Sequence, residues 1–275
     1  MDNAINAFES LCPSSAFAAR VSARETALGL IVKQARSADI SAAAAGCGYD
    51  VVYLDLQHSC MPVDIAAQIC VAAIAQGVTP WVRVGEGDAA TVLRLLDAGA
   101  MGIVFPDIRT AEQASAAARL CRFPPMGHRS SAARWPQFGY RAVSAPQARA
   151  WLDKNTAVIV MVESLAGLAN VKAIASVPGV SMVHVGCGDL AAEMGIVGDR
   201  DDLALFEALE CIRSACSDAG CRFGVGGFSA TSGAALDRVL ALRPDFLTAG
   251  NEWSLMLQAM GARTQDLRLR LAGAV

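Results

Sequence analysis

The sequence has little charge and no long uninterrupted apolar run. Charged residues make up 18% and hydrophobic residues 54% of its 275 residues. The longest apolar stretches are broken by Gly, Asp or Gln, and none reaches the ~18 residues that a membrane-spanning helix needs. A net charge of −3 and the lack of a basic block argue against nucleic acid as a partner. We therefore expect no nucleic-acid or membrane partner, and the apolar composition favours a homo-oligomer whose subunits bury apolar surface against each other.

The nine cysteines form no CxxC pair and no regular framework. Their odd number and their placement in apolar runs indicate reduced thiols. The first residues, Met1 to Ala4, lack the basic start and apolar core of a secretory signal, so we expect a cytoplasmic protein. Cys60 and Cys187 have no base beside them in the sequence, so neither is expected to be a nucleophile.

Short β-branched segments and Ala-rich amphipathic segments alternate with a period of about thirty residues, which is typical of βα units and a parallel sheet. Eight such units favour a TIM (β/α)8 barrel, formed as a single domain over residues 1–275. A doubly wound open sheet is the alternative, but no predicted strand is followed by a Gly-rich dinucleotide loop. The predicted strands cover 28–33, 51–56, 80–84, 102–106, 157–163, 181–186, 222–226 and 245–249.

Two regions lie outside this period. Terminal helices are predicted before Leu28 and after Glu252. The segment from Arg122 to Asn155 forms a long insertion before the fifth predicted strand. Long irregular segments in a compact domain are usually functional, so a functional role is expected for this one.

Acidic residues follow the fifth and sixth predicted strands. Glu163 comes directly after Val160–Val162, and Asp189 comes after the turn Gly186–Gly188. Carboxylates are rarely buried without a partner, and the carboxyl ends of barrel strands meet at one mouth. Glu163 and Asp189 are therefore predicted to bind a hard divalent cation, Mg²⁺ or Mn²⁺, with water and a substrate as further ligands.

Other strand ends supply groups for a substrate and for proton transfer. Arg83 ends the third strand, and its planar guanidinium suits a carboxylate or an oxo oxygen. His58 follows the second strand and is a candidate proton shuttle, whose tautomer Asp55 or another carboxylate could fix. The backbone N–H groups of the turn Gly186–Gly188 could receive a second carboxylate oxygen.

The remaining histidines and one lysine have simpler explanations. His184 lies inside the sixth strand and is predicted to be a core histidine with satisfied hydrogen bonds. His128, in the long insertion, is predicted to be solvated or close to substrate rather than a metal ligand. Lys33, at the end of the first strand, could carry a Schiff base, but its polar neighbours disfavour that role.

Six segments of the sequence together resemble a known family. They cover about Leu28 to Glu252, and the set is specific although no single segment is. The segments are Gly46–His58, Trp81–Val84, Leu95–Ala100, Cys121–Arg129, Val162–Ser164 and Val185–Leu190. They resemble the class II, metal-dependent pyruvate aldolases of the HpcH/HpaI group, which includes 4-hydroxy-2-oxoheptanedioate aldolase and 2-keto-3-deoxy-sugar-acid aldolases.

This resemblance implies a lyase that cleaves or forms a C–C bond of a 4-hydroxy-2-oxo acid through a pyruvate enolate, giving pyruvate and an aldehyde. It implies that Glu163 and Asp189 bind Mg²⁺, Mn²⁺ or Co²⁺. Arg83 would hold the pyruvyl unit, and the backbone at Gly188 and Asp189 would hold its carboxylate. His58 would act as the general base, directly or through water.

The resemblance also implies that Asp55 and Asp97 orient His58. It further implies that the last helix is exchanged with a neighbouring subunit, in a hexamer of paired subunits. Trp253, Leu257 and Met260 lie on one face of that predicted helix, which fits packing onto a neighbour.

The sequence departs from the family pattern at five positions. Gln57 replaces a Glu, Met161 a Gln, Cys187 a Pro, His128 an Arg and Asn251 an Asp. Because the predicted metal ligands, His58 and Arg83 are retained, the chemical core is expected to be intact. Met161, at a substrate-binding position, removes a hydrogen-bonding side chain from the mouth.

Two alternatives stay open. One is a CoA-ester lyase of the citrate lyase-like group, in which arginines of the long insertion would line a path for the CoA arm: Arg122, Arg129, Arg134 and Arg141. The other is a non-catalytic homologue that binds pyruvate or oxalate, which Gln57 and Met161 favour.

Overall fold

The computed structural model describes the chain except for residues 1–11, 14, 86–87, 198–200, 229–232 and 274–275. Eight parallel strands form a closed barrel in sequence order, and β8 pairs with β1 to close it. The prediction of a TIM barrel is confirmed, and each strand lies within two residues of its predicted bounds. The strands are β1 (Ala27–Val32), β2 (Val51–Asp55), β3 (Thr79–Arg83), β4 (Gly102–Phe105), β5 (Ala157–Val162), β6 (Met182–Gly186), β7 (Arg222–Gly226) and β8 (Phe246–Asn251).

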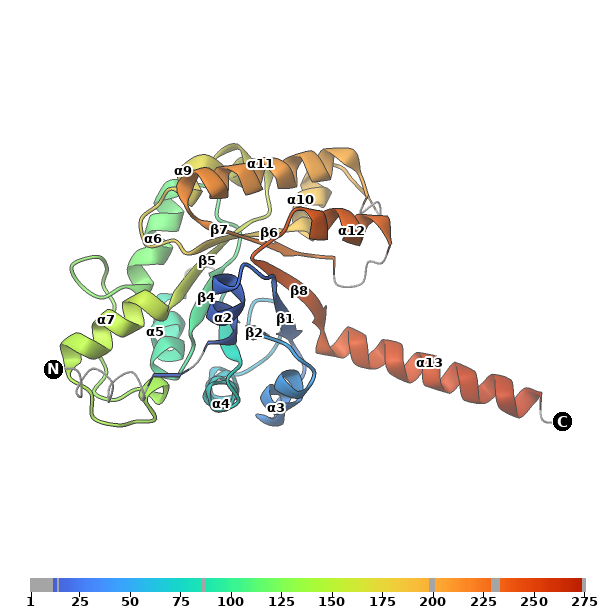
Figure 1. The fold of residues 1–275 in the computed structure, drawn as a ribbon, viewed down its shortest axis with the longest axis horizontal. Helices are drawn as coiled ribbons and strands as arrows, with labels where there is room; N and C mark the ends of the chain where they lie inside the picture. Colours follow the sequence, from blue (N-terminus) through green and yellow to red (C-terminus); the bar gives the residue numbers. More distant parts are fainter. Residues whose placement is uncertain (1–11, 14, 86–87, 198–200, 229–232, 274–275) are drawn as a thin grey trace.

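Helices cover the outside of the barrel (Figure 1). Polar caps fix several of their starts. Thr110, for example, forms a capping box with Gln113 at the start of α6. The described helices are α2 (Ala16–Ser22), α3 (Asp39–Gly46), α4 (Val63–Ala75), α5 (Ala89–Asp97), α6 (Ala111–Cys121), α7 (Ala145–Asn155), α8 (Leu165–Ala169), α9 (Val171–Ala175), α10 (Cys187–Glu193), α11 (Leu203–Ala219), α12 (Ala234–Ala241) and α13 (Glu252–Ala272), with a 3-10 turn at Pro136–Phe138. None of them is long and apolar enough to span a membrane.

Large rings fill the lower part of the barrel interior because glycines stand opposite them. A Cβ at Gly29 would overlap the Phe246 ring, and one at Gly102 would overlap Trp81. Phe17 of α2 closes the bottom, with its ring 4.7 Å from that of Trp81. This packing fills the interior at the amino ends of the strands and leaves the functional pocket of this fold at their carboxyl ends.

The long insertion lies at the closed end of the barrel. It follows the carboxyl end of α6 and leads into the amino end of β5, so both its ends lie away from the mouth. Its own small apolar cluster includes Phe123, Trp135 and Phe138. The buried Arg122 guanidinium donates to the carbonyl oxygens of Thr156 and Gly179, 3.0 Å from each. The long insertion therefore does not line the mouth of its own barrel in the described chain, and the structure does not support a role for it there.

The last helix, α13, begins at Glu252 as predicted and projects away from the barrel (Figure 1). None of its residues is buried, and Trp253, Leu257 and Met260 are 44%, 49% and 56% exposed. Glu252 anchors its start, because one carboxylate oxygen accepts from the backbone N–H groups of residues 33–35. The chain thus holds a long, partly apolar helix off its own barrel.

Candidate active site

A pocket of about 200 Å³ opens at the carboxyl ends of the strands. The structure brings most of the predicted site residues to this pocket and adds several that were not predicted. The predicted ones are His58, Arg83, Met161, Glu163, Cys187, Gly188 and Asp189; the others include Ile31, Tyr53, His184, Gly226 and Thr248. Asp55 lies directly behind this wall, bound to Arg83.

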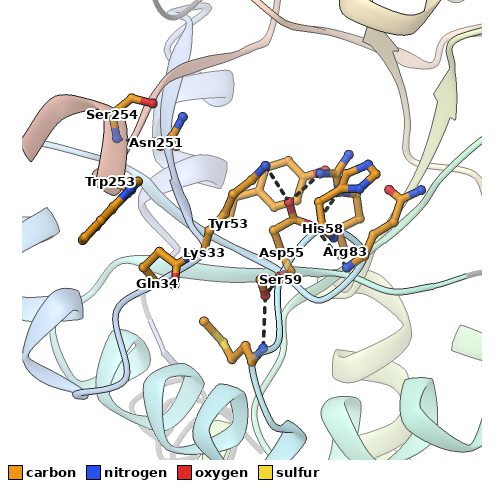
Figure 2. A network of polar contacts seen from close by, with 12 residues as sticks. Lys33, Gln34, Tyr53, Asp55, His58, Ser59, Arg83, Asn251, Trp253 and Ser254 are labelled. Atoms are coloured by element: carbon orange, nitrogen blue, oxygen red, sulfur yellow. Dashed lines mark hydrogen bonds and ion pairs between the residues drawn. The ribbon is translucent and has the colours of Figure 1, made fainter. Parts of the chain in front are cut away.

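Asp55 and Arg83 form a buried ion pair at the ends of β2 and β3. The guanidinium Nη2 lies 2.6 Å from Asp55 Oδ2 and Nε lies 2.9 Å from Oδ1. Lys33 Nζ is 3.4 Å from the same carboxylate, and Figure 2 shows Asp55 between the two cations. Burial raises the pKa of Asp55, but the hydrogen bonds and charge of Arg83 outweigh it and hold that pKa below its ordinary value.

This pairing corrects the expected role of Asp55. Its Oδ1 accepts from the backbone N–H groups of Gln57 and His58, each at 3.1 Å, and its remaining contacts go to Arg83 and Lys33. Asp55 therefore fixes the loop that carries His58 and the orientation of Arg83, not the tautomer of the imidazole. Lys33, held in this ion pair, is also poorly placed for a Schiff base.

His58 is exposed on the loop after β2, with its side chain at the pocket. Asp97 does not reach it within one chain. Asp97 ends α5, at the closed end of the barrel, where its Oδ1 lies 3.3 Å from Trp135 Nε1 and 3.5 Å from Arg129 Nη2. The expectation that Asp97 orients His58 is thus wrong for a single chain, because helix carboxyl ends face away from the mouth.

Glu163 and Asp189 provide two neighbouring carboxylates at the pocket, as a cation site requires. Glu163 is only 7% exposed; its Oε1 accepts from the Asp107 N–H at 2.7 Å, but its Oε2 has no partner among the described residues. Burial raises the pKa of Glu163, the Asp107 N–H opposes that shift, and the charge of Asp189 adds to it. Gly186 keeps the space beside Oε2 clear, since a Cβ there would overlap this oxygen.

A divalent cation would satisfy the unpartnered oxygen and relieve the repulsion between the two carboxylates. Within the described part of the chain, no group of three or more His, Cys, Asp or Glu side chains is placed to hold a metal. The residues therefore fit a two-carboxylate site in which water and substrate complete the ligand set.

Met161 closes one side of the pocket. Its Sδ accepts from the Tyr53 hydroxyl at 3.7 Å and lies 3.9 Å from Arg83 Nη1. The other departures from the family pattern at Asn251, Gln57 and His128 do not line this pocket. Asn251 caps α13, because its side-chain oxygen accepts a hydrogen bond from the Ser254 N–H. Figure 2 shows Asn251 and Ser254 near Trp253. Gln57 keeps a buried Oε1 without a partner among the described residues, and the exposed His128 lies in the long insertion at the closed end.

The prediction for His184 is right about its burial within the sixth strand and wrong about its hydrogen bonds. His184 is 2% exposed and lines the pocket, but its Nδ1 has no hydrogen-bond partner among the described residues, so the prediction of satisfied hydrogen bonds is wrong. Burial, with the charge of Arg83, lowers the pKa of His184 to about 3, so the ring is neutral. The alternation of side chains along a strand could have predicted His184 at the pocket, because it places His184 on the same face as Gly186, which was already assigned to the mouth.

Comparisons with known proteins identify the family and the fold. The family profile described as HpcH/HpaI aldolase/citrate lyase matches residues 29–230. A 4-hydroxy-4-methyl-2-oxoglutarate aldolase of Chaetomium globosum is 39% identical over 186 residues, 67% of this chain and 69% of that protein. A hydroxypyruvate/pyruvate aldolase of Paraburkholderia phytofirmans is 35% identical over 234 residues, 82% and 87% of the two chains. An HpcH/HpaI aldolase structure from Desulfitobacterium hafniense, 22% identical, shares the fold with a TM-score of 0.85 over 91% and 96% of the chains.

Proposed function

The chain belongs to the HpcH/HpaI aldolase/citrate lyase family and is a carbon–carbon lyase, and we propose that it works on 4-hydroxy-2-oxo acids with the help of a divalent cation. It cleaves them to a pyruvate-type 2-oxo acid and an aldehyde, or joins these in reverse. The observation that carries this proposal is the unpartnered Oε2 of Glu163, buried beside Asp189 and close enough to Arg83 for their charges to interact.

Glu163 and Asp189 would hold the cation, with Mg²⁺ or Mn²⁺ favoured and Co²⁺ a further candidate. When bound, such an ion acts as a Lewis acid and stabilises negative charge that develops on the oxo oxygen of the substrate. Arg83 binds the oxo acid, because Asp55 fixes its guanidinium plane while Nη1 lies toward Met161 at the pocket. The backbone at Gly188 and Asp189 receives the substrate carboxylate.

His58 takes the proton from the 4-hydroxy group, directly or through one water. The electrons of that O–H bond form the aldehyde carbonyl as the C3–C4 bond breaks. Those of the C3–C4 bond pass to the oxo acid as its enolate, and protonation at C3 then releases it. The names of the relatives suggest pyruvate or hydroxypyruvate as this product.

The two alternatives have weaker support. In the described chain, the insertion that was expected to serve a CoA arm lies at the closed end of the barrel, and Arg122 and Arg129 are buried there. A binding protein without turnover would not need a base, but His58 is exposed at the pocket with its backbone held by Asp55. The nine cysteines of the chain form no disulfide in the described structure, which fits a reducing compartment, and we place the enzyme in the cytoplasm.

His58→Ala is expected to lower kcat for cleavage by about 10²–10⁴-fold, the usual contribution of one general acid–base group. Metal affinity should stay almost unchanged, because the proposed ligands are Glu163 and Asp189. The measurements are product release from 4-hydroxy-2-oxo acids with Mg²⁺ or Mn²⁺, and calorimetric metal titration. If His58→Ala lost metal binding and excess metal restored its activity, His58 would be a ligand and the assignment as base would be wrong.

The exposed apolar face of α13 is expected to pack on another copy of this chain, in a hexamer built from dimers. Met256→Asp together with Met260→Asp should shift the protein toward smaller species, because each change would bury a charge in that contact. Light scattering at micromolar concentration measures this, with Gln258→Glu, on another side of the helix, as the control. A stable monomer of the unaltered chain would contradict this assembly.

A further inference from the structure

The floor of the pocket carries two polar side chains that no residue of the proposed mechanism uses. They are His184 from β6 and Thr248 from β8, which are 2% and 1% exposed and line the pocket. His184 Nδ1 and Thr248 Oγ1 are buried and have no hydrogen-bond partner among the described residues. Leaving such groups unpaired in a protein interior is costly, so two of them on one floor indicate a ligand.

Glycines on strand β7 let these two side chains approach its backbone closely. A Cβ at Gly226 would overlap His184 Nε2, at 2.7 Å, and would lie 3.4 Å from Thr248 Oγ1, so both atoms lie close to the backbone of this glycine. A Cβ at Gly224 would lie 2.9 Å from His184 Nδ1. Nδ1 therefore faces Gly224, deeper in the barrel, and Nε2 lies on the side of Gly226 and Thr248. Because His184, Gly226 and Thr248 all line the pocket, a small group bound there can reach Nε2 and the Thr248 hydroxyl together.

The other polar groups around this floor are already committed. The Tyr53 hydroxyl donates to Met161 Sδ, and Arg83 is bound to Asp55 through two hydrogen bonds. The imidazole is neutral, so one nitrogen donates and the other accepts, while a threonine hydroxyl can do both. A hydroxyl group is the small ligand that fits this pair best, since it donates one hydrogen bond and accepts another.

The position of a substrate follows from the proposed function, on which this inference rests. Arg83, the two carboxylates and the backbone at Gly188 take the carboxylate and the oxo oxygen of the oxo acid. The aldehyde must approach from the open side, where His58 lies exposed. The substituent on C3 of the oxo acid is then left facing the floor.

We propose that His184 and Thr248 form a hydroxyl-binding floor that makes the enzyme prefer a 2-oxo acid with a hydroxyl on C3, 3-hydroxypyruvate, over pyruvate. With pyruvate, a methyl group would lie beside His184 Nε2 and the Thr248 hydroxyl and could form a hydrogen bond with neither. A site built to hydrogen-bond a substrate hydroxyl discriminates strongly against the analogue that lacks it.

The test compares kcat/KM for the aldol addition of each donor to one aldehyde, glycolaldehyde. The unaltered enzyme should prefer 3-hydroxypyruvate by about tenfold or more, and Thr248→Val, which keeps the side-chain shape, should lower that preference about tenfold. His184→Phe should lower it similarly. Thr91→Val, the same change at a buried site on α5 outside the barrel, should leave the ratio unchanged.

The outcomes separate this inference from the proposed function. A preference for pyruvate, or a ratio that Thr248→Val leaves unaltered while both donors react, would overturn the hydroxyl-binding floor and keep the aldolase. If neither donor reacts, the proposed function fails. In that case, calorimetric titration of the Mn²⁺-loaded protein with each donor tests the hydroxyl-binding floor. Tighter binding of 3-hydroxypyruvate that Thr248→Val removes supports it, and equal or undetectable binding of the two donors overturns it.

Discussion

Glu163→Gln is expected to lower kcat/KM for cleavage of a 4-hydroxy-2-oxo acid by about 10³-fold or more. The amide would weaken the cation site, and a bound metal contributes several kcal/mol of transition-state stabilisation. The loss should match that of the unaltered enzyme treated with a chelator. Glu207→Gln, at an exposed position on α11, is the matched control and should keep full activity. Cleavage that survives both chelation and Glu163→Gln would exclude the metal mechanism.

The same variant should behave differently in a stability measurement. Burial and the charge of Asp189 raise the pKa of Glu163 in the folded, metal-free protein. A raised folded-state pKa stabilises the fold at low pH, and this contribution is lost as pH rises through that value. Glu163→Gln should therefore remove part of the decline of the metal-free protein's Tm with rising pH. Mn²⁺ should raise the Tm of the unaltered protein and have little effect on the variant; an equal metal-induced rise in both would place the cation elsewhere.

Asp55→Ala is expected to reduce the free energy of unfolding by about 3–5 kcal/mol, because it leaves the Arg83 guanidinium buried without its partner. Asp55 is fully buried and Arg83 is 11% exposed, so solvent screens this pair little. Asp201–Arg238 is an ion pair of the same 2.6 Å length whose side chains are 45% and 38% exposed. Asp201→Ala should therefore cost no more than about 1 kcal/mol. Urea unfolding with linear extrapolation gives both values.

A double variant separates stability from function at the same pair. Asp55→Leu with Arg83→Met replaces both charges by apolar groups and should recover much of the lost stability, as buried ion pairs often allow. It should not recover cleavage, because the group that binds the oxo acid is gone. If Asp55→Ala cost less than 1 kcal/mol, or if the double variant regained activity, Arg83 would not depend on Asp55 in this way.

The sequence by itself determined the barrel and which residues at the ends of its strands reach the mouth. Eight β-branched runs separated by amphipathic segments allow few arrangements other than a parallel barrel, and in such a barrel every strand end reaches the same mouth. A residue that ends a strand, such as Arg83, Glu163 or the nearby His58, is therefore placed by local order alone.

Only the tertiary structure decided which partner each side chain takes. Asp55 is close to His58 in sequence, but it pairs with Arg83 of the next strand because the register sets those two side chains side by side. Asp97, at the carboxyl end of α5, pairs with Arg129 of the long insertion at the closed end of the barrel. His184 and Thr248 face each other across Gly226, and neither segment carries a local sign of the other. Such pairings depend on register between distant strands and on competing hydrogen bonds, which a sequence read segment by segment does not contain.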